Sequence, residues 1–240
     1  MSKTKKFLEN IKKHRETKKT EKFYGNLEEY LRIVEKEKDI PILAHKRLFQ
    51  QIISHGITVL DESNPRCNKL FDGEKVKVYN YFSDQFFGME QSLQKVMRFL
   101  HSASMRGEES RQVLLLLGPV GAGKSALIEH IKGALEESGK FYKLEGCPIN
   151  EEPLHLIPRS LRKNFEKTYD VRIEGDLCPI CRHRLLSDYG GDYTSFPITE
   201  TSFSVRGRVG VGVVPPMDPN TQDTSLLIGA EDISKLDLYP

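Results

Sequence analysis

The feature that most constrains the fold of this chain is a glycine-rich block, Gly118-Pro119-Val120-Gly121-Ala122-Gly123-Lys124-Ser125. It matches G-x-x-x-x-G-K-[ST], the pattern of the phosphate-binding loop. Its glycines allow successive backbone N–H groups to point into one concavity, with no Cβ in the way of a phosphate. A helix that starts at such a loop adds its free N-terminal N–H groups and the positive end of its dipole. The block therefore predicts a site for a nucleoside triphosphate, and ATP is the expected nucleotide.

Two residues of the loop have separate predicted roles. Lys124 is the predicted catalytic residue, because its ammonium would contact the β- and γ-phosphates. The hydroxyl of Ser125 would be a ligand to the Mg²⁺ of Mg-ATP. Upstream, Phe87 and Gly88 belong to a Phe-Phe-Gly turn that could offer apolar contacts to an adenine ring. The alternative for this turn is core packing by its two phenylalanines.

The segments on either side of the loop indicate the fold class. The apolar run 112–117 is short, as a fully buried parallel strand should be. After the loop, apolar residues recur with helical spacing at Leu127, Ile128, Ile131, Ala134 and Leu135. Residues 141–144 then form a plausible second strand, and a right-handed crossover would make the two strands parallel. The sequence predicts an α/β fold of the P-loop NTPase class, with a parallel-sheet core.

Composition supports neither a nucleic-acid-binding protein nor a membrane protein. Hydrophobic residues make up 38% of the 240 and charged residues 29%, which suits a soluble protein with a core. The net charge of +2 gives no argument for nucleic-acid binding. No apolar stretch approaches the ~18 residues needed to span a bilayer. We expect no membrane partner and a cytoplasmic location.

The rest of the chain divides into further predicted segments. Residues 1–22 form a basic leader, either a helix that meets an acidic partner or nucleic acid, or a solvated and partly frayed helix. Residues 23–80 form an N-terminal helical element and a linker. Its first helix is capped by Asn26 with Glu29 in a capping box, its second runs over 44–54, and a short strand or hairpin arm follows. From 189 to 219, a composition of Gly, Pro, Thr, Ser and Val predicts inserted β-hairpins.

Several short segments beyond the loop carry a more specific pattern. They are Glu145-Gly146-Cys147-Pro148, Pro153-Leu154-His155-Leu156-Ile157-Pro158, Arg172-Ile173-Glu174-Gly175-Asp176-Leu177-Cys178-Pro179, Tyr189-Gly190-Gly191-Asp192, Arg208-Val209-Gly210-Val211-Gly212, Asp218-Pro219-Asn220-Thr221-Gln222-Asp223 and Leu227-Ile228-Gly229. With the phosphate loop, they resemble the AAA domain of the PrkA-type serine protein kinase family, over most of the chain from about Tyr24 on. The Pro-Leu-His-Leu-Ile-Pro stretch is far more specific than the loop.

The resemblance implies a nucleotide-hydrolysing AAA core related to ring-forming ATPases. We therefore expect an AAA-type P-loop domain over 81–240. The resemblance also allows a homo-oligomer. The family name attributes serine phosphorylation of protein substrates to a region C-terminal to this core. The resemblance also places the acidic strand needed for hydrolysis beyond Pro240, so the domain is expected to be incomplete at its C-terminal end. Within the chain, 226–232 is the candidate acidic strand, although its internal glycine suits a central strand poorly.

The cysteines leave three interpretations open. Cys178-Pro179-Ile180-Cys181-Arg182-His183 has the tight turn of a zinc knuckle, in which Cys178, Cys181 and His183 could supply three ligands. Cys147 is the first candidate for a fourth ligand, with Cys67 or His155 behind it. The pair could instead be a redox site or ordinary reduced thiols. Zinc is thus open but not assigned.

Three functions follow from these observations. The first is an ATP-binding core of a PrkA-like serine protein kinase, with a protein substrate. The second is an ATPase motor that remodels or delivers protein substrates. The third is a nucleotide-binding fragment without turnover, since the chain has no H-R-D-L, D-F-G or V-A-I-K signature and no clear acidic strand.

Overall fold

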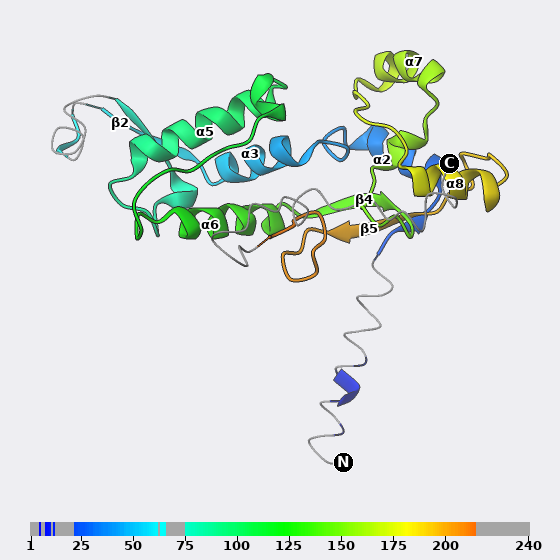
Figure 1. The fold of residues 1–240 in the computed structure, drawn as a ribbon, viewed down its shortest axis with the longest axis horizontal. Helices are drawn as coiled ribbons and strands as arrows, with labels where there is room; N and C mark the ends of the chain where they lie inside the picture. The colour runs from blue at the N-terminus through cyan, green and yellow to red at the C-terminus, as the bar shows by residue number, and fades with distance from the viewer. Residues whose placement is uncertain are drawn as a thin grey trace, which may run out of the picture. The chain divides into compact units, whose positions relative to one another are not determined.

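The described part of the chain forms two compact units (Figure 1). The computed structural model describes residues 5, 8–10, 12, 22–61, 63–65 and 75–214. One unit, here the sheet unit, takes in the described parts of Met1–Pro41, Lys140–Ser202 and Arg206–Pro240. The other, the helical unit, consists of Ile42–Gly139 and Phe203–Val205. The predicted domain boundaries at 22/23 and 80/81 stay predictions, and these units group the chain differently.

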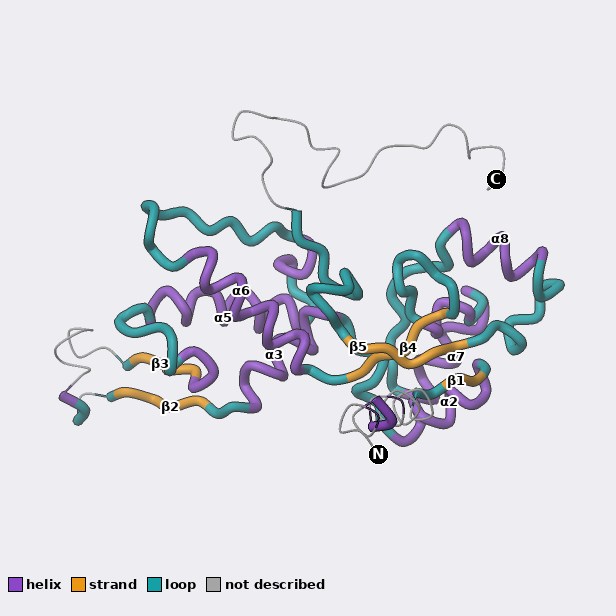
Figure 2. Tube along the Cα trace, turned by 90° about the horizontal axis from the view of Figure 1, so that it is seen from below, coloured by secondary structure: helices purple, strands orange, loops and turns teal. Residues whose placement is uncertain are grey.

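The sheet unit is built on a three-stranded antiparallel sheet. Its strands are β1 (Tyr24–Gly25), β5 (Ile198–Ser202) and β4 (Lys140–Leu144), in that order across the sheet (Figure 2). The helices of the unit are α2 (Leu27–Lys36), the 3₁₀ turn η3 (Pro153–Leu156), α7 (Arg159–Tyr169) and α8 (Pro179–Ser187). The residues at the centre of its core have no solvent exposure: Tyr30, Val34, Leu144, Leu156, Cys181, Phe196 and Ile198.

The start of α2 confirms the predicted capping box. The backbone N–H of Glu29 donates to Asn26 Oδ1 at 3.0 Å, and the N–H of Asn26 donates to Glu29 Oε2 at 3.1 Å. These bonds satisfy backbone donors at the helix start that have no partner within the helix. Behind the cap, Leu27, Tyr30 and Val34 are buried on one face.

Replacing Asn26 with alanine is expected to lower the free energy of unfolding by about 1 kcal/mol, because the cap is lost and nothing else changes. Urea denaturation followed by circular dichroism measures this loss. Asn164→Ala is the matched control, since Asn164 is exposed inside α7 and caps nothing. Equal midpoints for the two variants would contradict the prediction.

The helical unit packs three helices against a hairpin. These are α3 (Ala44–Ser54), α5 (Glu90–Ser104) and α6 (Lys124–Glu137), with the antiparallel strands β2 (Ile57–Leu60) and β3 (Val76–Tyr79) and the 3₁₀ turns η1 (Asn80–Phe82) and η2 (Glu108–Arg111). The short strand or hairpin arm before residue 80 and the helices α3 and α6 were predicted. The core of the unit gathers Ile52, Phe82, Phe86, Leu93, Met97, Leu127 and Ala134. No helix among the described residues is long and apolar enough to cross a membrane.

The predicted βαβ arrangement around the loop is wrong for the described residues. Strand β4 pairs antiparallel with β5, from Lys140↔Ser202 to Leu144↔Ile198, and it belongs to the sheet unit. The run 112–117 pairs with no strand among the described residues: Val113, Leu115 and Leu117 are 90%, 72% and 85% exposed, while Leu114 and Leu116 pack on the helical unit. A parallel strand is covered on both faces, and the described residues cover this segment on one.

Two smaller predictions concern the grouping of elements. Helices α2 and α3 belong to different compact units, and their grouping into one N-terminal element stays a prediction. Between 189 and 214 there is one strand, β5, and its partners β4 and β1 come from distant parts of the chain rather than from an inserted hairpin. Most of the basic leader, Cys67 and the candidate acidic strand 226–232 lie outside the described residues.

Candidate nucleotide site

The backbone of the predicted phosphate loop has the conformation that its glycines permit. Gly121 and Gly123 have φ of 83° and 78°, in the left-handed region that other residues rarely adopt. Gly123 is the N-cap of α6, and no described side chain caps this helix. The first backward helical bond joins the N–H of Leu127 to Gly123 O at 2.9 Å. The N–H groups of 124–126 therefore have no partner within the helix, which gives the loop a set of backbone donors for an anion.

Lys124 lies across the same loop. Its Nζ donates to Gly118 O at 2.8 Å and to Pro119 O at 2.6 Å. The ammonium is thus held at the loop by two neutral carbonyl oxygens, and Ser125 beside it is exposed. A phosphate oxygen is a stronger acceptor for an ammonium than a carbonyl is, because both partners are then charged. An incoming triphosphate would therefore exchange these bonds for charge-assisted ones.

The Phe-Phe-Gly turn lies beside the loop, and its two phenylalanines differ. A Cβ built on Gly123 would lie 3.8 Å from Met89 Sδ and 3.9 Å from Phe86 Cε1. Phe86 is buried in the core of the helical unit, whereas Phe87 is 73% exposed. Gly88, at φ 72°, turns the chain between them and Met89. Core packing thus explains Phe86, and contact of Phe87 and Gly88 with a nucleotide stays a prediction.

Helix α6 is held to the turn η1 by two hydrogen bonds between a pair of residues that were not predicted from the sequence. Tyr81 Oη donates to His130 O at 2.9 Å, and His130 Nε2 lies 2.8 Å from Tyr81 O. Since a carbonyl only accepts, Nε2 carries the proton. Burial raises the pKa of Tyr81 to about 12, so its hydroxyl stays a donor. The two residues are 49 positions apart, and no local pattern joins them.

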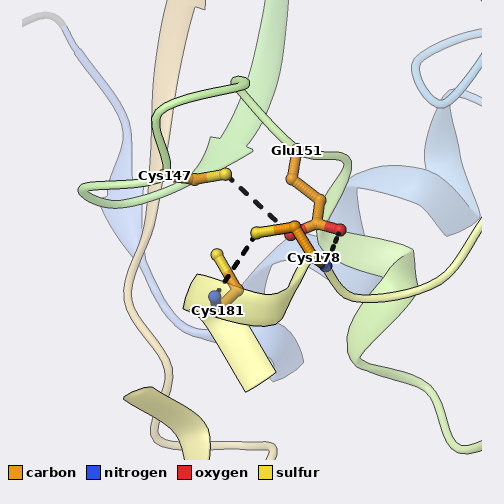
Figure 3. A group of neighbouring side chains, drawn as sticks. All are labelled: Cys147, Glu151, Cys178 and Cys181. Carbon is orange, nitrogen blue, oxygen red and sulfur yellow. Dashed lines mark hydrogen bonds between the residues drawn. The ribbon is translucent and has the colours of Figure 1, made fainter. Parts of the chain in front are cut away.

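The sheet unit brings most of the predicted zinc ligands together, but not all of them (Figure 3). Cys147, Cys178 and Cys181 gather with Glu151, which sequence reasoning did not nominate. His183 is exposed on α8 and is not part of this group. His155, the alternative candidate for the fourth ligand, contacts the carboxylate of Glu151 through Nδ1. We call these four residues, Cys147, Glu151, Cys178 and Cys181, the sulfur cluster.

The Pro-Leu-His-Leu-Ile-Pro stretch contains the 3₁₀ turn η3 (Pro153–Leu156), which lies next to the sulfur cluster. Leu154 and Leu156 are buried in the core of the sheet unit. Between them, His155 reaches Glu151 Oε1 with Nδ1 at 3.1 Å and Glu174 O with Nε2 at 2.6 Å. The stretch therefore supports the sulfur cluster.

Comparisons with known proteins agree with the resemblance. The PrkA AAA domain family matches residues 25–240. The chain is 35% identical over 238 residues to "ATP-dependent protease PrkA" of Bacillus subtilis, and 31% identical over 239 residues to "Serine/threonine kinase YeaG" of Escherichia coli K12. Each alignment covers 97% of this chain and 36% of the relative. No solved structure matches the chain significantly.

The match over nearly the whole chain settles the family, and with it the class of fold, an α/β P-loop NTPase. The chain spans 36% of the length of these two relatives, so their full activities include parts that it does not cover. This chain belongs to the PrkA AAA-domain family.

Proposed function

We propose that this chain is the ATP-binding core of a PrkA-like serine protein kinase and holds Mg-ATP on Gly118–Ser125. The observation that carries the proposal is the start of α6, where Gly121 and Gly123 are left-handed, backbone donors are free of helical partners, and Lys124 lies across the same loop. Backbone N–H groups, an ammonium and a hydroxyl are the groups that phosphate-binding loops use.

Each residue of the loop has a separate proposed task. The N–H groups of 124–126 would hold the β-phosphate, and Lys124 would place its charge at the β- and γ-phosphates. Ser125 would be a ligand to Mg²⁺, which supplies charge stabilisation at the γ-phosphate when bound. Phe87, exposed beside the loop, would contact the adenine ring. The proposed task of these residues is to bind and orient the nucleotide.

The parallel sheet beside the phosphate loop is also a proposal. We propose that the extended run 112–117 is a strand of the parallel-sheet core that this fold class uses, because it leads directly into the loop. Its exposed side chains Val113, Leu115 and Leu117 are apolar, as the covered face of such a strand would be.

Transfer of the γ-phosphoryl group to a serine in a protein substrate rests on the name of the relative YeaG. A second candidate is favoured by the name of the relative PrkA, an ATP-dependent protease. In that case the core would be a motor that hydrolyses ATP to remodel or deliver a protein, acting as a homo-oligomer. Steady phosphate release without a protein substrate favours the motor. Phosphoserine on an added protein favours the kinase, and binding without either product favours a nucleotide-binding fragment.

Replacing Lys124 with alanine is expected to weaken ATP binding about 10- to 100-fold. A charge-assisted contact with phosphate contributes about 1.5–3 kcal/mol, which corresponds to that range. Titration of wild type and variant with a fluorescent ATP analogue in the presence of Mg²⁺ measures the change.

The matched control is Lys95→Ala, which removes the same charge from an exposed position on α5 in the same unit. It should leave the affinity for ATP unchanged. If Lys124→Ala and Lys95→Ala bind ATP equally well, the loop is not the site.

A further inference from the structure

The sulfur cluster is built from two segments of the sheet unit (Figure 3). Cys147 and Glu151 lie in the tight loop after β4, which is closed by bonds from Cys147 N–H to Leu144 O at 3.2 Å and from Leu144 N–H to Glu151 O at 3.0 Å. Cys178 is the N-cap of α8, and Cys181 lies in its first turn. The three thiol sulfurs and one carboxylate oxygen all lie within 4.8 Å of one another.

The spacing of these atoms is close to that of a tetrahedral zinc site. Zinc–sulfur bonds of about 2.3 Å place ligand sulfurs about 3.8 Å apart at the corners of a tetrahedron. The ligand atoms lie within 4.8 Å of one another. The sulfurs would therefore move closer together by about 1 Å or less when an ion binds. Cys147 Sγ already lies 3.9 Å from Glu151 Oε2. Small shifts of side chains are enough to complete the site.

The carboxylate of Glu151 is positioned by contacts to one of its two oxygens. Oε1 accepts the backbone N–H of Cys178 at 2.7 Å and faces His155 Nδ1 at 3.1 Å. Oε2 faces the thiol of Cys147. Ligands to structural metals are commonly oriented in this way by a second set of hydrogen bonds. One oxygen is thus anchored, and the other is directed at the sulfurs.

His155 helps to orient the carboxylate of Glu151. Its Nε2 faces the carbonyl oxygen of Glu174 at 2.6 Å, so this nitrogen carries a proton. Its Nδ1 faces Glu151 Oε1 at 3.1 Å. The ring therefore lies between two fixed groups and supports the carboxylate as a ligand.

Burial separates most of the sulfur cluster from solvent. Cys147 and Cys181 are 4% and 0% exposed. A redox pair needs thiols that a partner can reach, and these two offer little access. A divalent cation would stabilise the deprotonated form of every ligand around it.

We propose that Cys147, Glu151, Cys178 and Cys181 bind one zinc ion as a structural site. Three sulfurs and one carboxylate oxygen suit zinc, and four protein ligands leave no open position for a substrate. The ion would join the loop after β4 to the start of α8. This proposal is independent of the nucleotide site, because all four residues belong to the sheet unit.

The test is the metal content of the full chain, purified under reducing conditions without added metal and measured by plasma mass spectrometry. We expect one zinc per chain in wild type and at least ten-fold less in Cys178→Ser and in Cys147→Ser. His183→Ala is the matched control: it removes an exposed histidine of the same motif from the same helix and should keep the zinc. His155→Gln should keep the fold and weaken zinc binding about 10- to 100-fold.

A second measurement does not depend on whether the cysteine variants fold. Wild-type chain freed of metal is titrated with Co²⁺ alone, and its absorption is followed. Thiolate-to-cobalt charge-transfer bands that saturate at one ion per chain, together with a higher melting temperature, support the site. Reduced wild-type chain that binds neither Zn²⁺ nor Co²⁺, a Cys178–Cys181 disulfide found by mass spectrometry of the purified protein, or unchanged zinc in Cys178→Ser would each overturn it.

Discussion

Replacing Phe82 with alanine is expected to lower the free energy of unfolding of the helical unit by about 3–5 kcal/mol. Phe82 is 1% exposed, and its ring packs at centroid distances of 5.3 Å from Tyr81, 5.6 Å from His130 and 6.1 Å from Phe86. Truncation removes this buried area and leaves a cavity that the rigid surroundings do not fill. The loss is large beside the total stability of about 5–15 kcal/mol of a typical domain.

The same substitution should also reduce ATP binding indirectly. Phe82 contacts His130 on α6 and Phe86 beside Gly123, so its ring supports both sides of the phosphate loop. Chemical denaturation followed by circular dichroism measures the stability, and the fluorescent nucleotide reports binding. Tryptophan fluorescence is no option, because the chain has no tryptophan.

Phe87→Ala is the matched control for Phe82→Ala. It removes the same side chain five residues away, but this ring is 73% exposed, and the expected loss of stability is within about 0.5 kcal/mol. Equal losses for the two variants would mean that the aromatic cluster does not support the unit. If Phe87 contacts adenine, as proposed, its variant should bind ATP less tightly while the melting curve stays unchanged.

Replacing Gly175 with alanine is expected to lower the free energy of unfolding of the sheet unit by about 3 kcal/mol. At φ 99°, an L-residue is strained by about 1–3 kcal/mol. The new Cβ would also lie 2.9 Å from both Cε1 and Nε2 of His155. That ring cannot easily move, because it is bonded to Glu151 and to Glu174 O. Crowding in a packed site adds its own cost.

Gly191→Ala separates the two contributions. Gly191 has a similar φ of 83° and lies in the same unit, but a Cβ there would meet nothing within 4 Å. It should show the backbone strain alone, about 1–2 kcal/mol. Thermal unfolding of the two variants beside wild type gives both values. If Gly191→Ala is as damaging as Gly175→Ala, contact with His155 contributes nothing.

Local chemistry explains which parts of the fold could be predicted. The capping box at Asn26, the helix over 44–54 and the apolar face of α6 depend on residues within one or two turns. The glycines of the phosphate loop are of the same kind, since a left-handed backbone is a property of the residue itself. Each of these predictions needed no knowledge of distant contacts.

The pairing of the sheet could not be read in this way. The segment 141–144 was predicted as a strand, and it lies within β4 (Lys140–Leu144), but the apolar pattern of a strand does not identify its partner. The usual right-handed crossover led to a parallel neighbour, whereas β4 pairs with β5, 54 residues beyond Leu144 at Ile198. Long-range pairing is set by the packing of Leu144 and Ile198 in one core, which no local rule contains.

The sulfur cluster was predicted in part for the same reason. The tight Cys178–Cys181 turn is local, and it pointed to metal chemistry. Glu151 was missed because carboxylates are common, and the backbone bond that positions it comes from Cys178, 27 residues later. Proximity in sequence favoured His183, but the direction of α8 leaves that side chain exposed. The one signal for Glu151 was its distance of four residues from both Cys147 and His155.

The extended run before the phosphate loop has a practical consequence for work with this chain. Val113, Leu115 and Leu117 present a row of apolar side chains to water along a backbone that has no strand partner among the described residues. Such a segment is a template for another copy of itself. Self-association would rise steeply with concentration, so titrations and melting curves are best compared at several dilutions.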